Sequence, residues 1–395
     1  MSASLDRRLL LKGSAALGGL GLTGLGGCTT VSGAQPAPAI GARPPLAPIR
    51  ARPERLFDLT VCLRPFRAMG PRFDTEQVGD ALVVHNYGHG GSGWSLSWGS
   101  AEIVVGKAMA GSPSAVAVVG CGALGLTTAI TAQRAGAKVT IYAKDLLPRT
   151  RSSRATGMFT PDSRIALTSA APSGFPEMWE QMARTSFKAF RSFLGLPGTP
   201  VEFIDYYGVS ALDEPSTTPD PGALDFVHYR GRIADLLPPS EHLPPEAAPF
   251  DAPFVGRSSN LIFNIADYGH TLLTDFLLAG GQIRHREFHS PAEFGALEEK
   301  VVINCTGYGA RALWNDQSLV PVRGQIGWLI PQPEVRYGLN YKDVSVVPRR
   351  DGIVVQALSG GDMRGYGDDR EVVDRSESEQ AVATLAEAMT RLRRA

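Results

Sequence analysis

The stretch from Val116 to Ala143 constrains the fold of this chain more than any other part of its sequence. A short β-branched run ends in the pattern Gly120-x-Gly122-x-x-Gly125, a run of small residues typical of a helix follows, and a second β-branched run closes the stretch. This order of strand, glycine turn, helix and strand predicts one β-α-β unit.

The three glycines of the pattern have separate mechanical roles in such a unit. Gly120 permits a tight turn, Gly122 lets the backbone approach a pyrophosphate, and Gly125 lets the helix pack closely on the strand. The free N–H groups at the start of the helix, at Ala123 and Leu124, would then face the anion. The stretch therefore predicts a dinucleotide-binding site, and a buried strand followed by a glycine-rich turn is the alternative.

An acidic residue that holds the adenosine ribose is expected about twenty positions after the first glycine. Asp145 fits this spacing, but Lys144 precedes it, and a lysine there would favour a phosphorylated ribose. The motif alone leaves FAD, NAD and NADP open.

Length and composition exclude some classes of protein. The chain has 395 residues, enough for a substantial core and two lobes. Lys plus Arg and Asp plus Glu each total 39, so no net field attracts nucleic acid or an anionic membrane. Three of the four cysteines, Cys28, Cys121 and Cys305, lie in local patterns that need no bridge, and we expect no disulfide framework.

Residues 1–28 are typical of an export signal. Arg7 and Arg8 precede a modestly apolar run that is too short and too rich in glycine to span a membrane comfortably, and paired arginines there indicate a twin-arginine signal. Leu25-Gly-Gly-Cys28 is similar to a lipoprotein cleavage box, with an ordinary cleaved signal as the alternative. Residues 29–56, rich in Pro, Ala and Gly, are expected to form a flexible tether. We therefore expect a periplasmic protein, with lipidation of Cys28 left open.

A second glycine-rich stretch, His85-Asn-Tyr-Gly-His-Gly-Gly-Ser-Gly93, follows a strand that starts at Ala81. So many glycines indicate a backbone pressed against a flat ligand, because side chains would block the approach. His85 and His89 have a spacing that suits a metal ion when it occurs on a helix, but the glycines exclude a stable helix and no third ligand is evident. We expect these histidines to make hydrogen bonds within the loop and to hold no metal.

Hydrophobic periodicity places the remaining elements. Residues 149–163 are expected to form a polar loop over a cofactor, and 201–263 to form strands broken by proline-rich loops. Helices are expected at 100–109, 175–194, 268–279 and 377–393, and further strands at 57–67, 282–287, 301–307, 321–330, 344–348 and 352–358.

Five motifs together resemble those of the D-amino-acid oxidase and D-aspartate oxidase family of FAD enzymes. They are the Gly120 pattern, the His85–Gly93 loop, Asn304-Cys-Thr-Gly307, Arg323-Gly-Gln325 and Leu63-Arg-Pro65. In the family the Arg-Pro strand and the glycine loop lie at the C-terminal end, whereas here both precede the dinucleotide motif. The chain therefore resembles a circularly permuted member, joined at residues 111–114.

The resemblance implies an α/β fold in which an FAD-binding, Rossmann-like parallel-sheet domain lies beside an antiparallel-sheet substrate domain. It implies a permuted segment with the substrate arginine and the flavin loop at 57–110, followed by the dinucleotide-binding unit at 115–170. A mixed region that is partly substrate lobe follows at 171–300, and the last FAD-domain strand lies at 301–325. Residues 326–395 are expected to form substrate lobe and a C-terminal helix.

The resemblance also implies a reaction, the oxidative deamination of D-amino acids to 2-oxo acids and ammonia, with hydrogen peroxide as a product if oxygen is the electron acceptor. Arg64 would bind the substrate carboxylate through a bidentate fork. The carbonyl of Gly91 would meet the substrate amine, and Tyr341 would help to hold the substrate. These three residues are expected to converge on one pocket, and the further FAD contacts implied are Gly90, Gly93, Thr306 and Gly307.

One departure from the family weakens the inference of the substrate. Ser345 stands where the family has a second tyrosine, and Tyr337 or Tyr366 are candidates to replace that phenol. The identity of the amino acid, the choice between oxygen and another acceptor, and the oligomeric state therefore stay open. A flavin enzyme that oxidises glycine or another amine, and a flavin-binding protein without turnover, are the alternatives.

Overall fold

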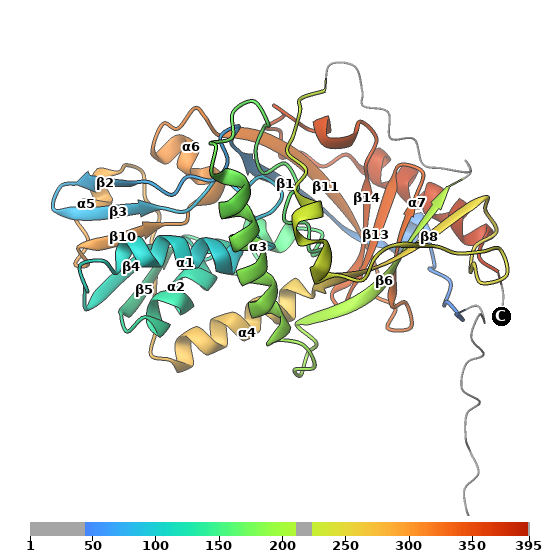
Figure 1. Cartoon of the computed structure of the whole chain (residues 1–395), viewed down its shortest axis with the longest axis horizontal. Helices are drawn as coiled ribbons and strands as arrows, with labels where there is room; N and C mark the ends of the chain where they lie inside the picture. The colour runs from blue at the N-terminus through green and yellow to red at the C-terminus, as the bar shows by residue number, and fades with distance from the viewer. Residues whose placement is uncertain (1–43, 211–222, 394–395) are drawn as a thin grey trace, which may run out of the picture. The chain divides into compact units, whose positions relative to one another are not determined.

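The computed structural model describes residues 44–210 and 223–393, whose strands form two β-sheets (Figure 1). The expected export signal at 1–28, including Cys28, lies outside the described residues, as does most of the expected tether. Among the described helices, none has the length and apolar character needed to cross a membrane.

The first sheet has six strands and contains the predicted β-α-β unit. Its strands are parallel except for the edge pair β2–β3. The central strand β4 is buried over most of its length, which its β-branched sequence predicts for a parallel strand covered on both faces. The strand order is β2 (Thr75–Val78), β3 (Ala81–His85), β10 (Val301–Asn304), β4 (Ala115–Val119), β5 (Lys138–Ala143) and β9 (Gln282–His285).

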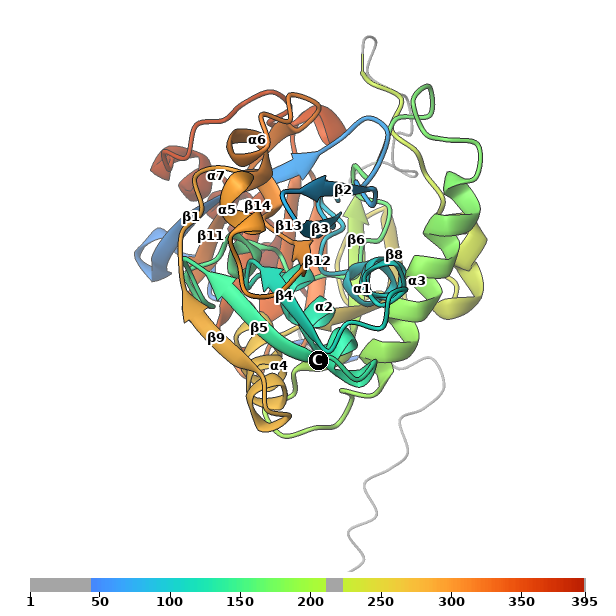
Figure 2. The same ribbon diagram turned by 90° about the vertical axis from the view of Figure 1, so that its left-hand side faces the viewer.

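Helices cover both faces of this sheet (Figure 2). One face packs on α1 (Ser97–Ala108) and α2 (Ala123–Arg134), against which α3 (Phe175–Arg191) and α4 (Ile265–Leu278) pack in turn. The other face packs on the short helices α5 (Ala292–Gly295) and α6 (Ala310–Leu313). Short 3-10 helices cover Pro53–Arg55, Arg151–Arg154, Arg230–Leu236, Gly307–Gly309 and Gly361–Met363.

The second sheet has eight strands and is antiparallel except for the pair β12–β6. The implied fold class, a parallel sheet beside an antiparallel one, is therefore confirmed, with one parallel pair that the sequence did not indicate. The strand order is β1 (Leu56–Phe66), β11 (Val320–Leu329), β14 (Gly352–Ala357), β13 (Val344–Arg349), β12 (Tyr337–Tyr341), β6 (Val201–Ser210), β8 (Phe254–Phe263) and β7 (Glu241–His242).

The segment expected at 57–110 contributes to both sheets. Strand β1 pairs with β11 along its whole length, from Leu56 opposite Leu329 to Phe66 opposite Val320. Strand β3 pairs in parallel with β10, although the two are far apart in the sequence. The segment that precedes the dinucleotide unit is thus an integral part of each sheet.

Helix α7 (Arg375–Thr390) packs on one face of the eight-stranded sheet (Figure 1). Asp374 caps its N-terminus, because the carboxylate accepts a hydrogen bond from the N–H of Glu377 at 3.2 Å. Tyr341 on β12 faces this helix: its hydroxyl donates to Glu387 at 2.7 Å and accepts from the Nε of Arg391 at 3.0 Å. Tyr341 is therefore a contact between sheet and helix.

We predict that Tyr341→Phe lowers the free energy of unfolding by about 1 kcal/mol, because it removes the hydroxyl of a buried tyrosine and with it the hydrogen bonds to Glu387 and Arg391. Urea denaturation measures the change. Tyr308→Phe is the matched control, since the described residues offer no hydrogen-bond partner to the Tyr308 hydroxyl, and it should leave stability unchanged. Equal effects of the two substitutions would contradict the assignment.

Candidate active site

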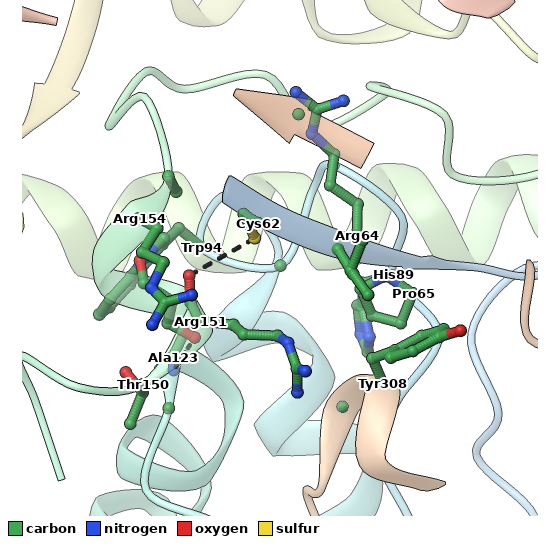
Figure 3. A pocket seen from close by; sticks show the side chains of 18 of the residues that line it. Cys62, Arg64, Pro65, His89, Trp94, Ala123, Thr150, Arg151, Arg154 and Tyr308 are labelled. Atoms are coloured by element: carbon green, nitrogen blue, oxygen red, sulfur yellow. Dashed lines mark hydrogen bonds between the residues drawn. The ribbon is translucent and has the colours of Figure 1, made fainter. Parts of the chain in front are cut away.

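A cavity of about 700 Å³ is lined by residues of both sheets (Figure 3). It reaches from the end of β5 to β1. Of the site residues predicted from the sequence, the cavity wall includes Arg64, Gly90, Gly91, Gly93, Gly120, Gly122, Ala123, Leu124, Lys144, Asp145, Thr306 and Gly307. Gly125 and Tyr341 are outside the wall.

The cavity opens at the carboxyl ends of the parallel strands. The N–H of Asn86, just after β3, donates to the carbonyl of Asn304 at 2.8 Å, and the N–H of Cys305 donates to the carbonyl of Val119 at the end of β4, also at 2.8 Å. The loops that leave these three strands therefore start side by side. Ligands of open α/β sheets bind at this edge.

The turn from β4 into α2 has the backbone that the glycine pattern predicts. Gly120 has a φ of +109°, and a Cβ there would overlap the carbonyl of Cys305. A Cβ on Gly125 would overlap the carbonyl of Gly120, so Gly125 serves close packing of helix on strand and need not touch the cavity. At the start of α2, the N–H of Ala123 donates to the Oγ of Ser152 at 3.0 Å, so the expectation that this N–H is free to face an anion is wrong for Ala123.

Lys144 and Asp145 follow β5 at one end of the cavity. The Nζ of Lys144 lies 2.9 Å from the Oε1 of Glu287, a residue just after β9 that also lines the cavity. This ion pair offsets the charge of Lys144 and leaves the carboxylate of Asp145 for a ribose hydroxyl. The end of the cavity therefore suits a ribose without a phosphate better than a phosphorylated one.

The glycine-rich loop after β3 passes very close to residues 163–164. The N–H of Gly91 donates to the carbonyl of Ser163 at 2.9 Å, and a Cβ on Gly90, where φ is +54°, would overlap the carbonyl of Arg164. Within the described residues, no donor reaches the carbonyl of Gly91. A Cβ on Gly93 would meet nothing within 4 Å, so the loop presents bare backbone to open space, as a flat ligand requires.

Arg64 is half-buried on β1, and its guanidinium points away from Pro65 and Tyr308 (Figure 3). It packs across Gly324, where any side chain would collide with it. The part of the chain that the structure describes gives its side chain neither a salt bridge nor a hydrogen bond. Burial, with the nearby charge of Arg164, lowers the pKa of Arg64 to about 10. The side chain is still a cation at neutral pH, and it faces a cavity that can hold an anion.

The expectation that Tyr341 joins Arg64 and Gly91 in one pocket is wrong. Arg64 and Gly91 line the cavity, but Tyr341 points to the opposite face of β12, because successive side chains of a strand alternate. The neighbouring Asn340 lines the cavity instead. Neither proposed replacement is in the wall: the hydroxyl of Tyr337 donates to the carbonyl of Ala47 at 2.9 Å, and Tyr366 packs on Phe66 with ring centroids 5.7 Å apart.

Tyr206 on β6 brings a phenol to the part of the cavity wall formed by the eight-stranded sheet, beside Ser345. Its hydroxyl lies 2.6 Å from the Oγ of Ser345 and 3.0 Å from the Oδ1 of Asn340. The ring lies over Gly338, which has no side chain to obstruct it. Burial raises the pKa of Tyr206 to about 12, so the phenol stays protonated at neutral pH. The serine that replaces a family tyrosine thus bonds to a phenol from another strand.

The two histidines of the glycine loop are buried and make hydrogen bonds. The Nε2 of His85 lies 3.0 Å from the Oε1 of Glu76, and the Nε2 of His89 lies 2.7 Å from the Oγ of Ser100. Burial lowers the pKa of His89 to about 3, so its ring is neutral. No group of metal-ligating side chains is found among the described residues.

Several residues that line the cavity were not predicted from the sequence. Ser152 and Ser163 fall in the polar loop expected over a cofactor at 149–163, so composition gave a partial signal. Arg164 lies one residue beyond that loop. Tyr206 gave no signal, because Tyr206 and Tyr207 are adjacent on a strand and the sequence does not show which of them faces the cavity.

Comparisons with known proteins identify the family of this chain. The family model described as DAO, FAD dependent oxidoreductase, matches residues 115–395. Similar curated proteins are D-amino-acid oxidases from Dugesia ryukyuensis (25% identity over 61% of this chain and 68% of the relative), Streptomyces coelicolor (28% over 53% and 58%) and Rubrobacter xylanophilus (32% over 53% and 57%). The chain thus matches between about half and two thirds of the length of these relatives.

Among solved structures, this chain is similar to the L-amino acid deaminase from Proteus vulgaris, with a TM-score of 0.45 and 15% identity over 71% of this chain and 75% of that one. The family match covers well over half of the chain and includes the glycine pattern and Asn304–Gly307. This protein therefore belongs to the DAO family of FAD-dependent oxidoreductases.

Proposed function

We propose that this protein oxidises a D-amino acid to the corresponding 2-oxo acid and ammonia, with Arg64 holding the substrate carboxylate. The observation that carries the proposal is the guanidinium of Arg64, which is half-buried, faces the cavity and makes no salt bridge or hydrogen bond among the described residues. Isolating a cation from water costs free energy unless a counter-ion binds, and an α-carboxylate matches its fork bidentately. The D configuration rests on the curated relatives.

The residues of the cavity fit FAD, the cofactor of the family. The glycines of the β4–α2 turn and of the loop after β3 leave bare backbone on the wall, and Ala123 and Leu124 start the helix that would face a pyrophosphate. Asp145 would bind the ribose, and Thr306 and Gly307 line the same cavity. When bound, FAD accepts the hydride from the substrate α-carbon.

The protein's own part in this reaction is to position the substrate. Arg64 binds the carboxylate, and the carbonyl of Gly91 accepts a hydrogen bond from the substrate amine, so two points fix the direction of the α-C–H bond. The imino acid that forms is hydrolysed to the 2-oxo acid and ammonia. Oxygen, with hydrogen peroxide as product, or another acceptor takes the electrons.

The chain is, in this proposal, a circularly permuted member of its family. Support comes from the family match, which starts at residue 115, directly after the joint at 111–114. Further support comes from β1 and β3, which pair with strands of the later sequence in both sheets. The N-terminal sequence supports export by the twin-arginine route to the periplasm, with or without a lipid at Cys28.

The test is a visible spectrum of the purified protein followed by anaerobic addition of a panel of D- and L-amino acids. Bleaching of a flavin band by D-amino acids is the expected result, and readmitted air separates an oxidase from a dehydrogenase. Bleaching by glycine or simple amines alone would favour an amine oxidase. A flavin band that no compound bleaches would favour a binding protein without turnover, and absence of flavin would contradict the proposal.

We predict that Arg64→Lys lowers kcat/KM for the best amino acid by at least about 100-fold, because the charge remains but the bidentate fork is lost. Steady-state kinetics with a check of flavin content measures the effect. Tyr341→Phe is the control, since that phenol faces α7, and it should leave turnover unchanged. Wild-type kinetics in Arg64→Lys would refute the role of Arg64.

We further predict that Gly125→Ala lowers stability by about 1–3 kcal/mol and releases flavin, because the new Cβ would push α2 away from the carbonyl of Gly120. The ratio of flavin to protein after gel filtration measures the loss. Gly106→Ala is matched, since Gly106 is an exposed glycine of α1 whose Cβ would meet nothing within 4 Å. It should keep its flavin and gain about 0.5–1 kcal/mol.

A further inference from the structure

We infer that His85 is a positioning residue of the cofactor site: acting through Asn304, it makes Thr306 a hydrogen-bond acceptor for a hydroxyl group of FAD. The inference rests on FAD, the cofactor of the proposed function, and not on the identity of the substrate. It assigns Thr306 to a hydroxyl of the ribityl chain or of the ribose, and it excludes a phosphate oxygen as the partner. His85 itself lies outside the cavity wall.

A chain of hydrogen bonds leads from the edge of the six-stranded sheet to the cavity. The Nε2 of His85 lies 3.0 Å from the Oε1 of Glu76 on β2. His85 and Asn304 are opposite each other on β3 and β10, and the Nδ1 of His85 lies 3.1 Å from the Nδ2 of Asn304. The Oδ1 of Asn304 lies 2.8 Å from the Oγ1 of Thr306, which lines the cavity. Because His85 and Asn304 are fully buried, the bond between them is shielded from water.

The backbone N–H of Thr306 fixes the direction of these hydrogen bonds at one end. It donates to the Oδ1 of Asn304 at 3.3 Å. Since a backbone N–H can only donate, the amide of Asn304 has its oxygen toward Thr306 and its NH2 group toward His85. The Nδ1 of His85 therefore accepts a hydrogen bond and carries no proton.

The carboxylate of Glu76 fixes the same direction at the other end. It accepts a hydrogen bond from the indole N–H of Trp314 and lies 3.7 Å from the guanidinium of Arg72. A carboxylate with these partners is an acceptor toward His85 as well, so the Nε2 of His85 carries the proton. Burial, with the charge of Arg72, lowers the pKa of His85, and the ring is neutral at neutral pH. Both ends therefore select one tautomer.

This direction leaves Thr306 without a donor for the cavity. Its N–H and its hydroxyl hydrogen both go to the Oδ1 of Asn304, so the Oγ1 presents only lone pairs. Within the described residues, no donor reaches this oxygen. A phosphate oxygen also offers only lone pairs and would be repelled, whereas a sugar or ribityl hydroxyl can donate to it. The partner of Thr306 in bound FAD is therefore a hydroxyl.

FAD analogues that each lack one hydroxyl, on the ribityl chain or on the ribose, test the bond to Thr306. We expect Thr306→Val, which keeps the shape of the side chain, to weaken FAD binding by about 10-fold. Loss of the partner hydroxyl should have a similar effect in the wild type and less than about a 2-fold effect in Thr306→Val. Flavin fluorescence of the full-length protein reloaded with each analogue measures the dissociation constants. Undiminished effects of every analogue in Thr306→Val would overturn the inference.

His85→Asn and His85→Leu separate positioning from packing. Asparagine can offer a side-chain oxygen to the amide of Asn304, whereas leucine has no acceptor. We expect His85→Leu to weaken FAD binding by about 10-fold and His85→Asn by less than about 3-fold. Equal losses in the two variants would contradict the role of His85.

Tyr87→Phe is the matched control for these variants. The hydroxyl of Tyr87 bonds to Arg72 at 2.8 Å and to Asp316 at 2.9 Å, and its ring centroid lies 5.5 Å from that of His85. The substitution thus disturbs the same buried cluster without removing a bond of the chain that leads to Thr306. It should lower stability in urea and keep the affinity for FAD. A loss of affinity as large as in His85→Leu would assign His85 to packing alone.

The tautomer of His85 gives a readout that packing does not change. In NMR spectra of the holoprotein with isotope-labelled histidine, the signal lost in His85→Asn should show a protonated Nε2 and an unprotonated Nδ1 at neutral pH. Asn304→Asp replaces the NH2 group that faces Nδ1 with an oxygen, so the ring should take up a second proton. A proton on Nδ1 in the wild type, or a ring that stays neutral in Asn304→Asp, would overturn the inference.

Neither the binding constants nor the spectra require turnover, so the two proposals fail separately. A protein that binds FAD through this chain of hydrogen bonds but oxidises no amino acid would contradict the proposed function alone. A protein that oxidises D-amino acids but shows no coupling between Thr306 and a cofactor hydroxyl would contradict this inference alone.

Discussion

The site depends on backbone lying directly against backbone at the carboxyl edge of the six-stranded sheet. Three strands end there in register, and the segments that leave them approach other main chain so closely that a Cβ at Gly90, Gly120 or Gly125 would overlap a carbonyl. Such contacts leave little room for adjustment, because packed interiors are dense. The wall is rigid because glycines at these positions allow main chain to pack directly on main chain. This rigid wall fixes where the polar groups of the cavity lie.

Against this wall the protein keeps a charge that would be unfavourable in an ordinary core. Arg64 is half-buried, with no salt bridge or hydrogen bond among the described residues, and the neighbouring Arg164 raises the cost of its charge further. Sites that bind or react tolerate such costs because a ligand repays them. Binding of a carboxylate therefore restores free energy that the guanidinium of Arg64 loses when it is removed from water.

The glycines and β-branched runs of the sequence were sufficient for the parallel sheet and the dinucleotide turn, since they report local backbone. The convergence of Arg64 and Gly91 on one cavity followed instead from the resemblance to a family. The sequence was insufficient to identify which tyrosine brings a phenol to the cavity beside Ser345. A shift of one position along a strand moves a side chain to the other face, so Tyr341 lies against α7 while Asn340 lines the cavity. Tyr206 reaches Ser345 across Gly338, a contact between distant strands that no local pattern reports.

The placement of β1 and β3 also affects the order in which the chain folds during synthesis. Leu56 lies opposite Leu329, and Leu82 lies opposite Val301, so the first strands to be synthesised find their neighbours only when most of the chain has appeared. Pairing across such separations is slow, because a long loop must close before any contact stabilises it. The cavity is therefore among the last parts of the molecule to form, and the flavin enters a chain that is already nearly complete.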